Sequence, residues 1–156
     1  MTDTSPVALP PGGIVLGFDY GTRRIGVAIG EQVTGGARPL PALVNRRAPD
    51  WQTLGRLIEQ WQPQACVVGL PLDQEGGRQP ITRQAETFAE QLRRRYGLPV
   101  YLCDERFSSR AADDELRQAR SDGRIRRRLR KSDRDGMAAR LILEQFLDSS
   151  AGTQRR

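Results

Sequence analysis

Three short stretches of the sequence carry carboxylates whose positions suggest chemistry. In GFDYGTRRIGVAIG, Asp19 closes an apolar run, and in LCDERFSS the pair Asp104 and Glu105 closes another. In KSDRDGMAARLILEQFL, Asp135 stands at the start of a helical pattern. A buried carboxylate without a partner is unfavourable and tends to take up a proton instead. Each of these residues therefore needs a turn, a cation, a metal ion or a phosphate nearby.

Each carboxylate could act alone, by capping a turn or a helix, or the three could act together as a metal site. Asp19 can hydrogen-bond the turn that follows it, the acidic pair at 104–105 can cap the next helix, and Asp135 can favour a helix start. Three carboxylates brought together would repel one another and could not all stay ionised without a cation. Oxygen ligands favour Mg²⁺ or Mn²⁺, and such a site activates water for attack on a phosphate.

The composition predicts one folded domain. The chain has 156 residues, of which 37% are hydrophobic and 28% charged. This length suits a single domain, which we place at residues 13–148, with flexible segments at 1–12 and 149–156. The composition excludes a disordered chain, and no apolar run approaches the roughly 20 residues of a membrane span. The first residues lack a secretory pattern and the two cysteines fall in strand-like runs, so we expect a cytoplasmic protein with free, packed thiols.

Histidine is absent and arginine is abundant. Without histidine, Ser-His-Asp and Cys-His catalysis and histidine zinc sites are excluded, so catalysis must rest on carboxylates, lysine, hydroxyls or bound metal. The formal net charge of +6 indicates an anionic partner.

Hydrophobic periodicity predicts an α/β fold. Apolar patterns indicate five strands, at 14–20, 24–30, 39–44, 65–70 and 99–103. Capping and periodicity indicate helices at 50–61, 81–96, 108–120 and about 133–148. This order is typical of the ribonuclease H-like arrangement, a mixed five-stranded sheet with helices on both faces. In such sheets ligands collect beyond the carboxyl ends of the strands, which is where Asp19, Asp104 and Glu105 fall, whereas Asp135 is expected in the first turn of the last helix.

A run of basic residues precedes the last helix. Between Arg120 and Lys131 the chain has one acidic residue, Asp122, and no aromatic residue. The alternatives are a solvated loop and a surface that holds phosphates, and contact with the nucleic-acid backbone is favoured over base stacking. Nearer the carboxylates, Arg23, Arg24 and Arg106 can clamp the reacting phosphate or serve as surface charge. The predicted nucleic-acid contacts are Arg23, Arg24, Arg106, Arg124, Arg126, Arg127, Arg128 and Lys131.

Taken together, the motifs resemble those of the YqgF (RuvX) family of ribonuclease H-like proteins. The resemblance covers about residues 14–147 and rests on FDYGTRRIGVAIG, TGGARPLPAL, VVGLPL, DERFSS and DRDGMAARLILEQFL in this order. It implies a metal-dependent nuclease, a phosphodiester hydrolase, that processes the 5′ end of precursor 16S rRNA during ribosome biogenesis. It also implies that Asp19, Glu105 and Asp135 are the catalytic and metal-binding residues. Asp133 is the rival of Asp135, but Lys131 lies four residues before Asp135, a spacing that the family often shows.

Two other classes of function remain open. A nuclease for four-way DNA junctions would use the same site, so its substrate would be branched DNA in place of precursor rRNA. The DYGT sequence is also similar to the first phosphate loop of actin and the sugar kinases, which would make the chain a nucleotide-binding or phosphotransferase domain, although those proteins use two such domains. A binding module without catalysis is disfavoured by the three acidic residues. Ribosomal precursor particles are expected partners, no membrane is expected, and the chain is compatible with a monomer or a homodimer.

Overall fold

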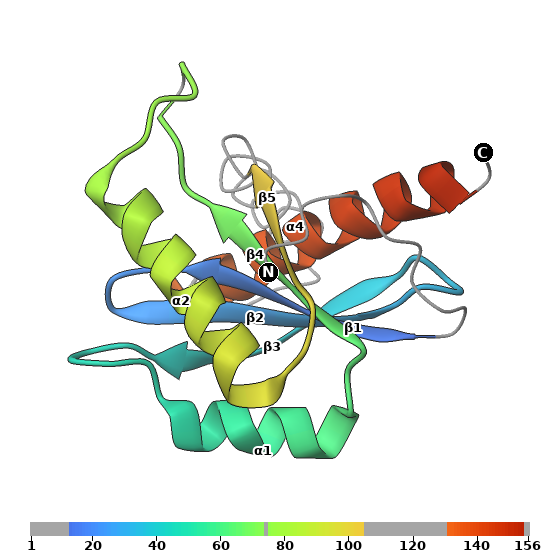
Figure 1. The fold of residues 1–156 in the computed structure, drawn as a ribbon, viewed down its shortest axis with the longest axis horizontal. Helices are drawn as coiled ribbons and strands as arrows, with labels where there is room; N and C mark the ends of the chain where they lie inside the picture. The colour runs from blue at the N-terminus through green and yellow to red at the C-terminus, as the bar shows by residue number, and fades with distance from the viewer. Residues whose placement is uncertain (1–12, 74, 105–130, 155–156) are drawn as a thin grey trace, which may run out of the picture.

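The fold is built on one mixed sheet (Figure 1). The computed structural model describes residues 13–73, 75–104 and 131–154, with the side chains of 131–135 and 149–154 excepted. The strand order is β3-β2-β1-β4-β5, in which β1, β2 and β3 are antiparallel and β4 and β5 run parallel to β1. The five strands are β1 (Ile14–Tyr20), β2 (Arg24–Glu31), β3 (Ala37–Val44), β4 (Ala65–Leu70) and β5 (Val100–Asp104).

The positions of the five strands and of the first two helices agree with the sequence prediction. Helix α1 (Trp51–Trp61) begins after Asp50, whose carboxylate accepts hydrogen bonds from the Thr53 N–H at 3.2 Å and the Thr53 hydroxyl at 2.7 Å. These bonds lower the pKa of Asp50. Helix α2 (Pro80–Tyr96) ends at Gly97, whose φ of 65° is the left-handed conformation that favours glycine. Local signals therefore mark the start of α1 and the end of α2.

The last helix is longer than expected. Helix α4 covers Lys131–Gln154, whereas the sequence pattern indicated about 133–148. The helix predicted at 108–120 lies outside the described residues. The domain division at residues 12/13 and 148/149 stays a prediction.

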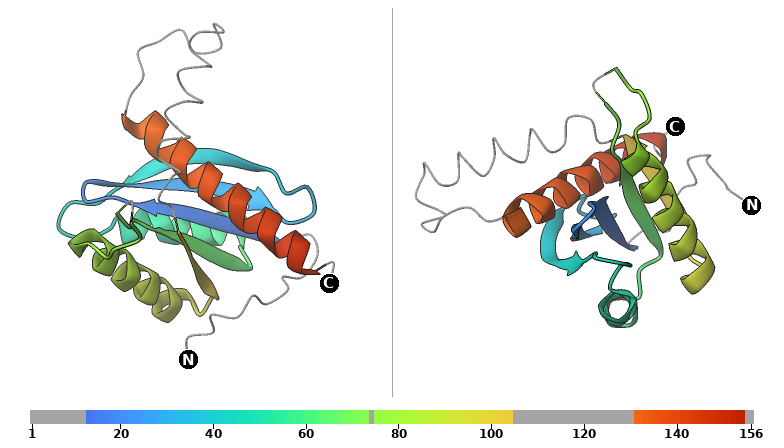
Figure 2. Two further views of the ribbon diagram at one scale, coloured as in Figure 1. Left: turned by 90° about the horizontal axis from the view of Figure 1, so that it is seen from above. Right: turned by 90° about the vertical axis from the view of Figure 1, so that its left-hand side faces the viewer.

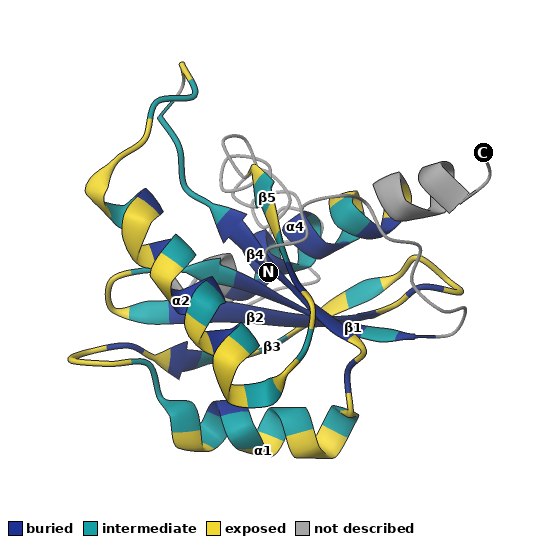
Figure 3. Ribbon diagram, viewed as in Figure 1, coloured by how far each residue is buried: buried dark blue, intermediate teal, exposed yellow. Residues whose placement is uncertain are grey.

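Helices cover both faces of the sheet, as predicted. Figure 2 shows α4 lying across one face and α2 on the other. On the α2 face, the buried cluster combines sheet residues such as Phe18 and Val68 with Leu54 of α1 and Phe88 of α2. On the α4 face, a smaller cluster packs sheet residues against the helix, and its members are Val15, Ala28, Ala65, Val67, Ala139, Ile142, Leu143 and Leu147. Figure 3 shows the buried residues concentrated in the central strands.

Helix α4 approaches the sheet closely because glycines lie beneath it. A Cβ atom added to Gly17 would lie 3.0 Å from the Cβ of Leu143. At Gly30, an added Cβ would lie 3.0 Å from side-chain atoms of both Leu143 and Leu147. Such distances are shorter than ordinary carbon contacts, so a larger residue at either position would push the helix away. Leu143 is fully buried at the centre of this contact.

The outer strand β3 has features of an edge. It borders only β2, and a register shift between Ile25 and Val27 interrupts the pairing. It also contains Pro39 and Pro41, which have no N–H to donate. Proline is tolerated here because an edge strand leaves half of its N–H positions without a sheet partner.

We predict that Leu143→Ala lowers the free energy of unfolding by about 3 kcal/mol, because it removes buried methyl groups and leaves a cavity between helix and sheet. Urea unfolding measures this loss. The matched control is Gln145→Ala, an exposed position of the same helix, which should change stability by less than about 0.5 kcal/mol. Equal effects of the two substitutions would contradict the packing described for α4.

Candidate functional site

Asp19 lies near the carboxyl end of β1, on the face covered by α4. Val15 and Gly17, which lie four and two residues earlier in β1, both pack against α4, and side chains alternate along a strand. Asp19 is half-buried. The central strand thus presents its carboxylate to the space between the sheet and the last helix.

Both strand neighbours of Asp19 are glycines. Its antiparallel partner in β2 is Gly26, and its parallel partner in β4 is Gly69. Paired residues place their side chains on the same face of a sheet, so neither adjoining strand sets a side chain beside the carboxylate in this row. The next residue in the row is Cys103 of β5, the partner of Gly69. In this row the strands on either side of Asp19 therefore place only backbone beside its carboxylate.

The neighbouring acid Asp104 belongs to the other face. In β5, Tyr101 and Cys103 pack with the α4 cluster, while Val100 packs with the opposite cluster. Asp104 follows Cys103 and is exposed, so alternation places it on the face of Val100. Asp19 and Asp104 therefore point to opposite sides of the sheet although both strands end nearby.

When α4 is followed from its C-terminus back to its N-terminus, it crosses the sheet obliquely toward the carboxyl end of β1. Leu143 and Leu147 contact the position of Gly30, and one turn earlier Ala139 and Leu143 contact that of Gly17. Gly17 lies two residues before Asp19 in β1, whereas Val15, the strand partner of Gly30, lies four residues before it. The contacts of α4 therefore move toward Asp19 as the helix is followed back. Further back, a Cβ on Gly136 would lie 3.0 Å from the Cβ of Pro39. The backbone at Asp135, next to Gly136, is thus on the side of the sheet that Asp19 faces.

The turn after Asp19 is held by Asn45. Its backbone N–H donates to the Arg23 carbonyl at 2.8 Å, and its side-chain amide donates to the Gly21 carbonyl at 2.6 Å. Asn45 is only 4% exposed, so these bonds are shielded from water. Gly21 has no room for a side chain, because an added Cβ would lie 2.4 Å from the Arg24 carbonyl oxygen. The turn that carries Arg23 and Arg24 is therefore fixed relative to β3.

The predicted cations of this turn border a small cavity. Arg23 and Arg24 line a space of about 470 Å³ together with Thr22, Asn45 and Arg46. Arg23 is exposed and Arg24 half-buried. Two of the predicted phosphate contacts thus lie within a few residues of Asp19 in the chain and share one concave surface with a further arginine.

The other predicted site residues lie outside the described side chains. These residues are Glu105, Arg106, Arg124, Arg126, Arg127, Arg128, Lys131 and Asp135. Lys131 and Asp135 belong to the first turns of α4 by their backbone. Within the described part of the chain, no three potential ligand side chains gather into a metal site. The convergence of the three acids stays a prediction.

Sequence reasoning missed several residues that the structure brings to this end of the sheet. Asn45 gave no signal, because its role depends on the register of β3 against the turn. The glycines on either side of Asp19 were visible only as parts of the RIGVAIG and VVGLPL patterns, and only the pairing shows that they are neighbours. Four arginines, Arg47, Arg78, Arg83 and Arg95, are dispersed in the sequence and line one groove.

The fold resembles solved nucleic-acid enzymes. Thermus thermophilus RuvC, solved in complex with a Holliday junction substrate, superposes with a TM-score of 0.52 and 18% identity, covering 90% of this chain and 97% of that one. The yeast mitochondrial Holliday junction resolvase Ydc2 gives a TM-score of 0.56 and 13% identity, covering 93% and 82%. The protein therefore has a ribonuclease H-like fold, as the sequence predicted. Among the described helices, none is both long and apolar enough to cross a membrane.

Sequence comparison identifies the family. The family model described as "RuvX: Holliday junction resolvase" matches residues 13–149. A relative from Xanthomonas axonopodis pv. citri (strain 306), named "Putative pre-16S rRNA nuclease", is 48% identical over 141 residues, 90% of each chain. A relative of the same name from Chromohalobacter salexigens is 46% identical over 143 residues, 91% of this chain and 94% of the relative. The chain belongs to the RuvX family.

We predict that Asn45→Ala loosens the turn that follows Asp19. The substitution leaves the Gly21 carbonyl without its donor, and the loss of such a buried hydrogen bond should lower the free energy of unfolding by about 1–2 kcal/mol. Hydrogen exchange should rise at the amides of residues 21–24 more than elsewhere. Gln52→Ala, at an exposed position of α1, is the control. Unchanged exchange in the turn would show that Asn45 does not hold it.

Proposed function

We propose that this protein is a metal-dependent nuclease that hydrolyses phosphodiester bonds at the 5′ end of precursor 16S rRNA. The observation that carries the proposal is the position of Asp19 between two glycines near the carboxyl end of the central strand. Its support comes from relatives of 42–48% identity that bear the pre-16S rRNA nuclease name. The absence of histidine leaves carboxylates, lysine, hydroxyls or bound metal as the means of activating water, and the three acids favour bound metal.

In this proposal Asp19, Glu105 and Asp135 hold a divalent cation, Mg²⁺ or Mn²⁺. The cation would supply a water of lowered pKa and neutralise the charge that develops on the phosphate. Asp19 contributes an oxygen ligand from a rigid strand, which limits its movement. Arg23 and Arg24, fixed through the turn that Asn45 holds, would orient the phosphate backbone beside it.

The geometry of β5 supports Glu105 as the second acid. Asp104 is on the sheet face opposite to Asp19, so its carboxylate is poorly placed to share a cation with Asp19. The oblique path of α4 supports Asp135 as the third acid, because the helix is directed toward the row of Asp19.

Cleavage of branched DNA is the second candidate function. It is favoured by the family description and by the fold shared with resolvases. The same three acids would act in either reaction, and the substrates would differ in what binds outside the metal site. Precursor rRNA and ribosomal precursor particles in the cytoplasm are the partners under the first candidate. A homodimer would suit the second, since a junction has two strands to cut.

We predict that Asp19→Asn abolishes metal-dependent cleavage while the fold is kept, because the side chain retains its shape and loses its charge. Glu105→Gln and Asp135→Asn should do the same, and Asp133→Asn should have a milder effect. The assay is cleavage of precursor 16S rRNA by purified protein with Mg²⁺ or Mn²⁺, beside single strands and four-way junctions at one salt concentration.

Asp104→Asn is the matched control for this series. It removes the same charge from the residue next to Glu105 in the chain. Because Asp104 lies on the face of the sheet opposite to Asp19, cleavage should persist. Full activity of Asp19→Asn at matched metal concentration would exclude Asp19 as a ligand. An inactive Asp133→Asn beside an active Asp135→Asn would move the third acid by half a turn of α4.

We predict that neutralising Arg126, Arg127 and Arg128 together weakens binding to RNA of any sequence. Each lost phosphate contact lowers the salt slope for a single strand by about 0.7, so the slope should fall by roughly 2. Thermal stability should hardly change, because like charges that lie close together in the sequence repel one another and contribute little to folding. An early melting transition with unchanged RNA affinity would assign the run a structural role.

A further inference from the structure

A groove of about 850 Å³ lies on the face of the sheet opposite to Asp19. It is bordered by Tyr20 at the end of β1, by the loop between β3 and α1, and by α2. Its described lining contains four arginines and three glutamines and no acidic residue. A concave surface of this charge selects for an anionic ligand.

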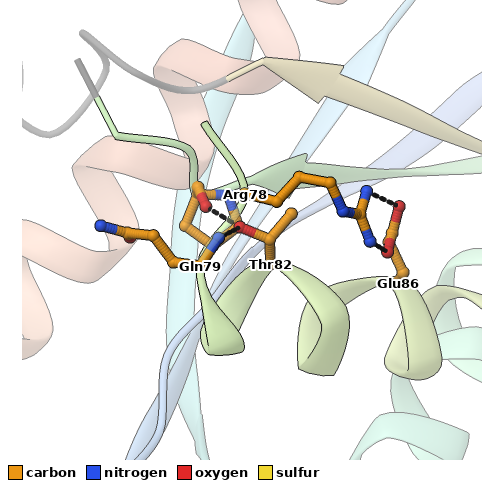
Figure 4. A network of polar contacts seen from close by, with 5 residues as sticks. Arg78, Gln79, Thr82 and Glu86 are labelled. Carbon is orange, nitrogen blue, oxygen red and sulfur yellow. Dashed lines mark hydrogen bonds and ion pairs between the residues drawn. The ribbon is translucent and has the colours of Figure 1, made fainter. Parts of the chain in front are cut away.

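The charges of the groove are largely uncompensated. Arg78 is paired with Glu86 through its two terminal guanidinium nitrogens, one of them at 2.8 Å, and this pairing raises the pKa of Arg78 (Figure 4). Arg47, Arg83 and Arg95 make no ion pair among the described residues. Arg83 is close enough to Glu86 to help lower its pKa, yet Glu86 is already held by Arg78. Three cationic side chains are therefore available to a ligand.

One end of the groove carries a planar cation on an aromatic ring. The Arg95 guanidinium lies over Trp51, 4.1 Å from the ring centroid. Trp51 in turn stacks with the buried ring of Phe88 at 5.6 Å and an interplanar angle of 30°. Arginine held in this way presents a flat, fixed surface, and RNA bases stack on guanidinium planes as well as on aromatic rings.

The groove is elongated. Its lining residues on α2 extend from Pro80 to Arg95, which at about 1.5 Å per residue corresponds to roughly 22 Å along the helix. It also adjoins the predicted substrate path, because Tyr20 follows Asp19 in the chain and Arg47 follows Arg46 of the smaller arginine cavity. A ligand held beside Asp19 could thus continue around the end of the sheet into the groove.

We propose that this groove binds a single-stranded segment of RNA that flanks the cleavage site. Arg47 and Arg83 contact its phosphates, and the Arg95–Trp51 pair stacks with a base. The inference rests on the proposed function for the identity of the ligand, but the groove and its charge are independent of catalysis. Its length favours a strand over a mononucleotide, and the stacked guanidinium favours unpaired bases over a duplex.

The test measures binding without cleavage. A fluorescent oligouridylate of about 15 nucleotides and a duplex RNA of the same length are titrated by anisotropy in EDTA, at several salt concentrations. Arg47→Gln combined with Arg83→Gln should lower the salt slope for the single strand by about 1.4, since two phosphate contacts are lost. The matched control is Arg56→Gln with Arg94→Gln, which removes equal charge from exposed positions of α1 and α2 outside the groove lining.

Arg95→Lys separates stacking from charge. It keeps the cation and removes the planar surface, so affinity for the single strand should fall about fivefold while affinity for the duplex stays unchanged. Thermal melting of each variant checks the fold. Equal binding by the groove variant and its control would overturn the proposal. So would full competition by uridine monophosphate at a concentration that matches the oligonucleotide, because the groove would then hold a nucleotide.

The binding and cleavage assays together distinguish failure of the groove proposal from failure of the proposed nuclease function. If wild-type protein binds the single strand through the groove but does not cleave precursor 16S rRNA with Mg²⁺ or Mn²⁺, the groove stands and the nuclease proposal fails. If cleavage is observed and the groove variants bind and cleave as wild type does, the nuclease proposal stands and the groove is not part of the substrate path.

Discussion

The close approach of α4 to the sheet governs the geometry of this molecule. Because Gly17 and Gly30 lack side chains, Leu143 can lie almost against the backbone of the two central strands. This contact fixes the height and the oblique direction of the helix, and with them the backbone position from which Asp135 extends. Any acid contributed by the helix can work with Asp19 only if this packing is kept. The position of the first turn of α4 relative to the sheet is therefore coupled to core packing through two glycines.

Much of the fold could be predicted because its elements carry local signals. The strands are continuous apolar runs, and Asp50 and Gly97 mark a helix start and a helix end by their own chemistry. The extension of α4 to Gln154 was missed because its last residues include no marked apolar face. A helix end without a capping residue depends on small differences in helix propensity. The sequence pattern therefore placed the end of α4 too early.

The site could be predicted only in part, because its chemistry depends on pairing between distant strands. Asp19 was recognisable from its place at the end of an apolar run. That Gly26 and Gly69 lie on either side of it follows from the register, which no local pattern encodes. That Asp104 and Asp19 lie on opposite faces of the sheet likewise follows from the register of β1, β4 and β5 and the alternation of side chains along each strand. The arginines of the groove could not be grouped from the sequence for the same reason, since they lie on two loops and a helix that meet only in the folded chain.

The prolines of β3 have a consequence for the behaviour of the protein at high concentration. An exposed sheet edge is a template on which another copy can add a strand, and this is a route to aggregation. Pro39 and Pro41 remove two N–H donors from the strand that forms one margin of the sheet. Strand addition at that margin would lack a regular ladder of hydrogen bonds. A cationic protein becomes locally concentrated on a polyanion, and at this margin the prolines disfavour the strand addition that crowding promotes.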